Sequence, residues 1–70
     1  MNEEELHIAV LTEPFEPKRL YLSDGRIVDI PRPGTIAVGR RTSAVVIDGL
    51  VHTISNLLIT RVEPLVGAAS

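Results

Sequence analysis

Short runs rich in Val, Ile and Leu recur between residues 18 and 62 of this chain, as expected of β-strands. Gly, Pro or Asp-Gly separates many of these runs at short intervals, as expected of strands joined by turns. The pattern predicts strands around residues 18–22, 26–30, 35–39, 43–47, 50–54 and 57–62. Five or six short strands at this spacing are typical of an antiparallel meander, so the predicted fold class is mainly β, within α+β.

The first thirteen residues have a helical pattern instead. Asn2 suits an N-cap, and Glu3–Glu5 would lie in the first turn, where carboxylates interact favourably with the helix dipole. Leu6, Ala9 and Val10 then follow the i, i+3, i+4 spacing of one helix face, and Leu11 widens it. Pro14 disfavours helical geometry in Glu13, so the helix is expected to end by that residue.

The segment Leu20–Ile30 predicts a β-hairpin around Asp24-Gly25. A two-residue loop would place Asp29 opposite Leu20, on an apolar face. A three-residue loop, Ser23-Asp24-Gly25, instead aligns four apolar side chains on one face, namely Leu20, Leu22, Val28 and Ile30. The second register is therefore expected, with Gly25 in a left-handed conformation that forms a bulge, and with Arg19, Tyr21, Ile27 and Asp29 on the opposite face.

The structure of the remaining segments is predicted from their prolines and glycines, which interrupt strands, and from their apolar runs. Phe15, inside a proline-bounded connector, is expected to plug the edge of the core. Residues 31–34 contain two prolines and are expected to be a connection or an edge. The nearly continuous apolar run Ser43–Ile47 predicts a strand covered on both faces. Asp48-Gly49 predicts a turn.

These elements together predict one small domain spanning residues 1–70. A helix occupies residues 1–13, a β-sheet region occupies residues 18–63, and residues 64–70 form a tail that is expected to fray. Closing or strongly bending the strands into a small barrel would remove exposed strand edges. This layout is similar in architecture to SH3-like and Sm-like barrels, although the paired motifs of the Sm family are absent, so its RNA-binding role is not implied.

The chain is short for a stable domain. A chain of 70 residues buries only roughly 60% of the surface of its unfolded form, so oligomerisation is expected to add stability.

The composition also bears on where the protein resides. The chain has no cysteine, which excludes disulfides and thiolate chemistry. The N-terminal residues are acidic rather than basic, and no apolar run approaches the roughly 20 residues of a membrane span. We therefore expect a cytoplasmic protein without a membrane partner.

Charge is distributed unevenly, although the net charge is only −2. Residues 1–17 carry five acids and no bases, residues 18–41 carry six bases and two acids, and residues 42–70 carry one base and two acids. This split could produce a basic face on an acidic protein. It could equally place solvated basic side chains along one side of a sheet.

Four separated segments of the chain resemble a group of other proteins more closely than the barrel architecture does. They are Pro14-Phe15-Glu16-Pro17, Leu20–Arg26, Ile36–Arg41 and Ile59–Leu65. Together they resemble a group of short uncharacterised bacterial proteins with the pattern PFxPxxLxLxDGR, then IAVGRR, then ITRVEPL. The resemblance spans residues 14 to 65 and implies that this region evolved as one domain, but it implies no activity.

The arginines provide the best candidates for ligand contact. Arg40 and Arg41 follow a glycine at the end of a predicted strand, and guanidinium groups bind phosphate or carboxylate oxygens in pairs. With Arg26 and Arg32 they could form a patch for an anion or a nucleic acid. The alternative is that they are solvated turn residues, or form salt bridges to the acidic helix of a second subunit. Only Tyr21 is placed to stack on a base, which weakens the nucleic-acid interpretation.

No other residues form a pattern of catalytic or metal-binding chemistry. His7 and His52 lie far apart in the chain and have no second ligand at a diagnostic spacing. Asp24 and Asp48 precede glycines, where aspartate caps turns, and Ser23 and Ser43 lack a recognisable base. We therefore expect a non-enzymatic protein without cofactor or metal.

The leading functional hypothesis is a small interaction module, an adaptor or structural component that self-associates into a homo-oligomer through apolar sheet surface. A further protein partner is compatible with it. The alternative is a nucleic-acid-binding regulator that uses Arg26, Arg32, Arg40 and Arg41.

Overall fold

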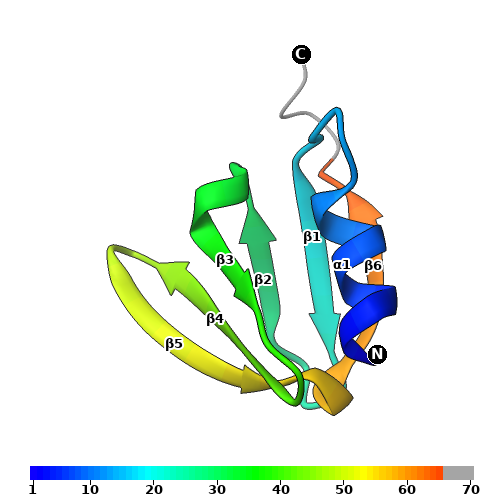
Figure 1. The fold of residues 1–70 in the computed structure, drawn as a ribbon. Coiled ribbons are helices and arrows are strands. Elements are labelled where there is room, and N and C mark those ends of the chain that lie inside the picture. The colour runs from blue at the N-terminus through cyan, green and yellow to red at the C-terminus, as the bar shows by residue number, and fades with distance from the viewer. Residues whose placement is uncertain (66–70) are drawn as a thin grey trace.

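The structure, a computed structural model, describes residues 1–65 and shows one short helix followed by six strands (Figure 1). This confirms a mainly β fold with an N-terminal helix. The helix is α1 (Glu3–Leu11), and two 3₁₀ turns are η1 (Pro33–Thr35) and η2 (Asn56–Leu58). The strands are β1 (Lys18–Leu22), β2 (Ile27–Ile30), β3 (Ile36–Val38), β4 (Thr42–Ile47), β5 (Leu50–Ser55) and β6 (Ile59–Pro64).

Helix α1 begins with a capping box. The Asn2 side chain accepts a hydrogen bond from the Glu5 amide (2.8 Å), and the Glu5 carboxylate accepts one from the Asn2 amide (3.1 Å). Leu6 and Val10 are buried, as their spacing predicts, and the helix ends at Leu11, before Pro14.

The first hairpin has the predicted register. Leu20 lies opposite Val28, and the Leu22 amide donates to the carbonyl of Arg26 (2.9 Å), which leaves a three-residue loop. Gly25 has φ +93°, the left-handed conformation that the bulged loop requires. All four apolar side chains of the predicted inner face are buried.

The strands form two antiparallel sheets instead of one meander. Sheet A has the order β2-β1-β6, and sheet B has the order β3-β4-β5. The last strand therefore returns to β1 and does not pair with β5. The reason is η2, which turns the chain between the sheets and includes Leu57 and Leu58, residues predicted to lie in the last strand. Thr35 likewise belongs to η1 rather than to β3.

The core lies between the sheets and α1 and is mostly aliphatic. Its buried apolar residues are Leu6, Val10, Leu20, Leu22, Val28, Ile30, Ile36, Val45, Ile54 and Ile59. Phe15 is half-buried and packs against the edge of this cluster, as predicted. Helix and both sheets thus share one core.

The expectation that Ser43–Ile47 is covered on both faces is wrong. Ser43 and Val45 are buried, whereas Val46 is exposed, so β4 alternates like a strand with one covered face. The helix that could have covered the other face packs into the shared core instead. In Figure 1 the β4–β5 hairpin extends away from the rest of the molecule.

The C-terminal end of the described chain is paired. Pro64 lies opposite Lys18, and the Leu65 amide donates to the carbonyl of Pro17 (3.0 Å). The rest of the predicted tail lies outside the described residues. Within residues 1–65, no helix has both the length and the hydropathy needed to cross a bilayer.

Candidate functional site

The four arginines predicted to form a patch do not come together. Arg26 lies beside the β1–β2 turn, where its guanidinium forms an ion pair with Asp24 (2.8 Å). Arg32 lies at the opposite end of β2, at the start of η1, where its carbonyl accepts hydrogen bonds from Thr35. Arg40 and Arg41 are neighbours in the chain, and their turn lies at the same end of the molecule as the β1–β2 turn, opposite to the end that carries Arg32 (Figure 1).

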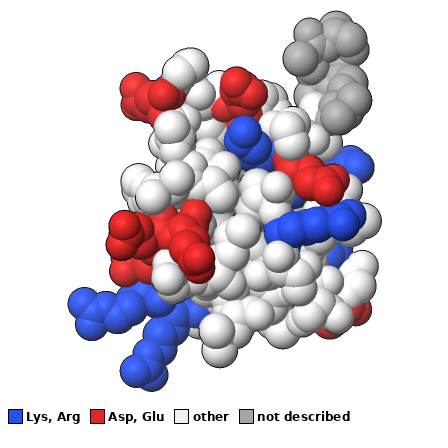
Figure 2. Space-filling model, turned by 90° about the vertical axis from the view of Figure 1, so that its right-hand side faces the viewer, with Lys and Arg blue, Asp and Glu red and all other residues white. Residues whose placement is uncertain are grey.

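Arg40 and Arg41 form the turn between β3 and β4 and are exposed. With Met1 and Asn2 they line a hollow of about 420 Å³ beside the start of α1. Neither guanidinium belongs to an ion pair within the described part of the chain. Figure 2 shows basic side chains extending from the lower edge of the molecule, directly below a group of acidic side chains. Positive and negative side chains thus lie side by side on this face.

A buried asparagine holds this turn in place. The Asn56 side chain accepts a hydrogen bond from the Ser43 hydroxyl (2.6 Å) and donates one to the carbonyl of Gly39 (2.8 Å). Its backbone amide donates to the carbonyl of Arg41 (2.8 Å). A side chain at Gly39 would overlap the carbonyl oxygen of Thr42, so the turn also requires glycine there.

The floor of the hollow is completed by the N-terminus. The terminal amino group of Met1 donates hydrogen bonds to the carbonyls of Asn56 (2.9 Å) and Ile59 (3.2 Å). The capping box of α1 satisfies the amides of Asn2 and Glu5. The hollow therefore offers two arginines at its rim, beside the first turn of α1, which carries Glu3, Glu4 and Glu5.

The outer face of sheet A is charged and internally paired. Arg19 contacts both carboxylate oxygens of Asp29 (2.7 and 3.3 Å), and this carboxylate raises the pKa of Arg19. Arg61 forms an ion pair with Glu63 (3.3 Å) and lies over the ring of Tyr21, 4.1 Å from its centre. Such exposed pairs each contribute little stability, but they keep this face hydrated.

Sheet B has the opposite character. From Thr42 to Thr60, Asp48 is the only acidic residue, and there is no Lys or Arg. Leu50 and Val51 are 65% and 71% exposed, and Val46, which lies opposite Val51, is also exposed. The β4–β5 hairpin, residues 42–55, therefore presents apolar side chains to solvent.

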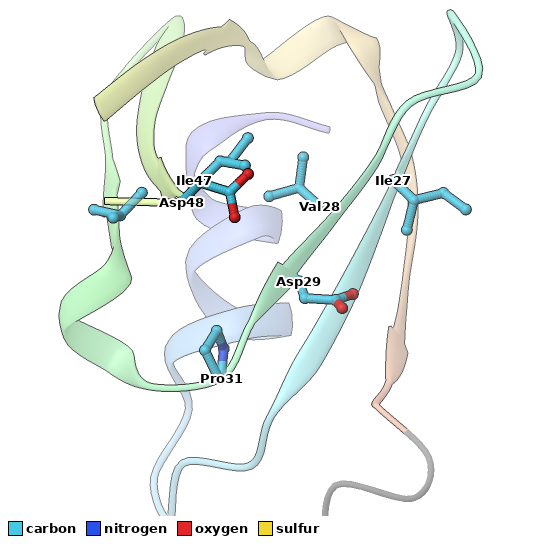
Figure 3. Close-up of a pocket in the computed structure, with 7 residues that line it drawn as sticks. Ile27, Val28, Asp29, Pro31, Ile47 and Asp48 are labelled. Atoms are coloured by element: carbon cyan, nitrogen blue, oxygen red, sulfur yellow. The ribbon is translucent and has the colours of Figure 1, made fainter. Parts of the chain in front are cut away.

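A groove of about 310 Å³ separates this hairpin from β2. Figure 3 shows Ile27, Val28 and Asp29 along one wall, with Ile47 and Asp48 on the other. Asp29 is held by Arg19, and no histidine lines the groove. The two carboxylates that line the groove, those of Asp29 and Asp48, lie on opposite walls.

The other titratable candidates stand apart. His7 is exposed on α1 and His52 is exposed on β5. Asp24 caps its own turn, as predicted: its carboxylate accepts from the Arg26 amide (3.0 Å), and this bond together with the Arg26 guanidinium lowers the pKa of Asp24. No three His, Asp or Glu side chains among residues 1–65 are arranged to hold a metal ion.

Sequence reasoning missed the exposure of the β4–β5 hairpin. The sequence holds no signal for it: Ser43–Ile47 shows no alternation of polar and apolar residues, and the absence of Lys, Arg and Glu from Thr42 to Thr60 is also what a buried strand would show. A continuous apolar run on an outer hairpin can look like a fully buried strand.

No protein-family model, no curated protein and no solved structure matches this chain.

Proposed function

We propose that this protein is a non-enzymatic interaction module that self-associates through the β4–β5 hairpin. The observation that carries the proposal is the exposed apolar surface of Val46, Leu50 and Val51 on a segment almost without charge. Depletion of charge and exposure of aliphatic side chains distinguish the cores of protein interfaces from ordinary surface.

A second copy of the same chain is the occupant that this surface fits. Sheet A presents Arg19, Asp29 and Arg61, each already paired within the molecule, and would lose hydration on docking. Docking through the β4–β5 hairpin would remove water from only one carboxylate, that of Asp48. The chain is short and its aliphatic core is small. Association therefore adds a larger share of its stability than it would for a large domain.

The shape of the fold belongs to the same proposal. The two sheets share one core and meet through the turns η1 and η2, which supports a strongly bent, small barrel of the SH3-like type. Self-association through sheet B would protect the strand edge that such an incompletely closed barrel leaves open.

The proposal is tested by placing a charge in the hairpin. Val51→Lys puts an ammonium group in the expected interface, and sedimentation equilibrium should show association at least about tenfold weaker than in the wild type. The matched control is Ile8→Lys, which replaces an exposed apolar residue on α1 and should leave association unchanged. Equal association of Val51→Lys and wild type would contradict the proposal.

A nucleic-acid-binding role is the second candidate, and one observation favours it. Arg40 and Arg41 are exposed, lie together, and form no ion pair within the described chain. Two adjacent free guanidinium groups could contact successive phosphates. Arg26 and Arg32 lie too far from each other to extend this contact as one patch.

This candidate is tested by fluorescence anisotropy with a labelled single-stranded DNA at about 50 mM salt. The double substitution Arg40→Ala with Arg41→Ala should abolish binding and the salt dependence that comes with it. Arg26→Ala is the matched control, because Arg26 is already engaged by Asp24. Absence of binding by the wild-type protein at low salt would remove the candidate.

A further inference from the structure

Each three-stranded sheet leaves two edges without a strand partner among the described residues. In sheet A these are β2 and β6, and in sheet B they are β3 and β5. A free edge presents unpaired amides and carbonyls, and folded proteins usually protect it with prolines, charges or very short strands. The four edges differ in how well they are protected.

Three of the edges carry such protection. Strand β2 is followed by Pro31, and the groove on its free side is walled by Asp48. Strand β3 has only three residues, which is too short to guide a partner. Strand β6 carries Arg61 and Glu63 and ends at Pro64.

Strand β5 has none of these features. It spans six residues, Leu50–Ser55, without a proline or an acidic or basic residue apart from His52. Its first four side chains are exposed. Among the described strands, this combination of length, apolar exposure and missing protection occurs only at β5.

The register of the hairpin shows which backbone groups of β5 are free. The Asn56 amide bonds to the carbonyl of Arg41, and the tight turn Asp48-Gly49 joins the other end of the hairpin. Hydrogen-bonded pairs alternate along an antiparallel ladder, so the intervening residues of β5 point their amides and carbonyls outward. These residues are Val51, Thr53 and Ser55.

We propose that two copies of this chain pair through their β5 strands, antiparallel, about a two-fold axis at His52. This inference rests on the proposed self-association and names its geometry: sheet B continues across the axis into a sheet of six strands. The outward amide and carbonyl of Val51 meet those of Thr53 in the second copy. Both residues thereby gain backbone hydrogen bonds without any side-chain rearrangement.

The side chains favour this register over the one centred on Thr53. With the axis at His52, Leu50 lies opposite Ile54 of the second copy, on the face that lines the core. The exposed Leu50 thereby extends the apolar core of its partner, and symmetry repeats the contact. With the axis at Thr53, Leu50 would instead lie opposite the polar residue Asn56.

Charge agrees with the antiparallel arrangement. The Asp48 turn is at one end of the hairpin, and Arg41 is at the other end, next to Asn56. Antiparallel pairing brings the Asp48 turn of one copy to the Arg41 end of the other. The arrangement therefore places opposite charges together at both ends of the interface.

Single cysteines test this geometry cleanly, because the chain has none of its own. His52→Cys places two thiols opposite each other at the axis, within reach of a disulfide. Thr53→Cys is the matched control, since it is exposed and adjacent but lies opposite Val51 of the second copy. Under mild oxidation, His52→Cys should form the covalent dimer about tenfold faster than Thr53→Cys, because disulfides require Cβ atoms within about 4.5 Å.

Amide hydrogen exchange separates failure of this geometry from failure of self-association. As protein concentration rises, the amides of Val51 and Thr53 should become protected in step with dimer formation. Dimerisation without this protection, or with faster cross-linking at Thr53, overturns the β5 pairing but leaves the proposed function standing. A protein that remains monomeric at every concentration overturns both.

Discussion

The Ser43 hydroxyl donates a hydrogen bond of 2.6 Å to the Asn56 side chain, and both residues are only 2% exposed. The Asn56 amide group also holds the carbonyl of Gly39, so one side chain links β4, η2 and the β3–β4 turn. No buried side-chain nitrogen or oxygen among residues 1–65 lacks a hydrogen-bond partner. This polar cluster therefore fixes where the aliphatic core ends.

Removing the cluster should destabilise the fold strongly. Asn56→Ala leaves the Ser43 hydroxyl and the Gly39 carbonyl without partners, and each unsatisfied buried group costs about 1–3 kcal/mol. We expect a loss of about 3 kcal/mol in the free energy of unfolding, measured by urea denaturation at fixed protein concentration. Thr60→Ala removes an exposed hydrogen bond to the carbonyl of Tyr21 and should cost no more than about 0.5 kcal/mol. Equal losses in the two variants would contradict the role of Asn56.

A side chain at Gly39 should have a related effect. Gly39→Ala forces a Cβ against the carbonyl of Thr42, and relieving such overlap costs about 1–3 kcal/mol. Gly34→Ala is the control, because a Cβ there meets no atom within 4 Å. Thermal denaturation should show a lower midpoint for Gly39→Ala and little change for Gly34→Ala.

The β1–β2 turn should weaken in acid. The pKa of Asp24 is lowered by the Arg26 amide and guanidinium, so the turn contributes stability above the unfolded pKa of about 3.9. That contribution is lost as pH falls through the lower, folded pKa. Asp24→Asn removes the charge, so the difference in melting temperature between wild type and variant should shrink from about pH 5 towards about pH 2. A difference that does not change with pH would contradict this account.

The first hairpin shows how much local pattern can determine. A two-residue loop would place Asp29 opposite Leu20 on an apolar face, so the three-residue loop was the prediction, and the structure confirms it, with Leu20 opposite Val28. The capped helix was predictable for a similar reason, since Asn2 and the proline at 14 mark its limits independently of the rest of the chain. These features depend on neighbours in sequence.

The features that sequence reasoning missed depend on distant contacts. Whether Val46 is covered depends on where the helix packs, and nothing near β4 encodes that. The return of β6 to β1 depends on η2 turning the chain from one sheet to the other. The arginines were grouped by closeness in sequence, but β2 separates Arg26 from Arg32. The candidate site thus had to come from the structure.

A proline in β5 should separate folding from association. The Thr53 amide points away from β4, so Thr53→Pro removes no hydrogen bond within the hairpin, and prolines are tolerated at such edge positions. It should weaken dimerisation, because it removes two hydrogen bonds across the two-fold axis, each worth about 1 kcal/mol. Thr53→Ala is the control for side-chain loss. Light scattering reports the dimer, and circular dichroism checks that the fold is kept.

The most direct test of the central claim is the molar mass of the wild-type protein across a dilution series, measured by sedimentation equilibrium. Self-association through the β4–β5 hairpin predicts a mass that approaches twice 7.6 kDa at high concentration and falls towards 7.6 kDa on dilution. A mass of 7.6 kDa at every concentration would contradict it.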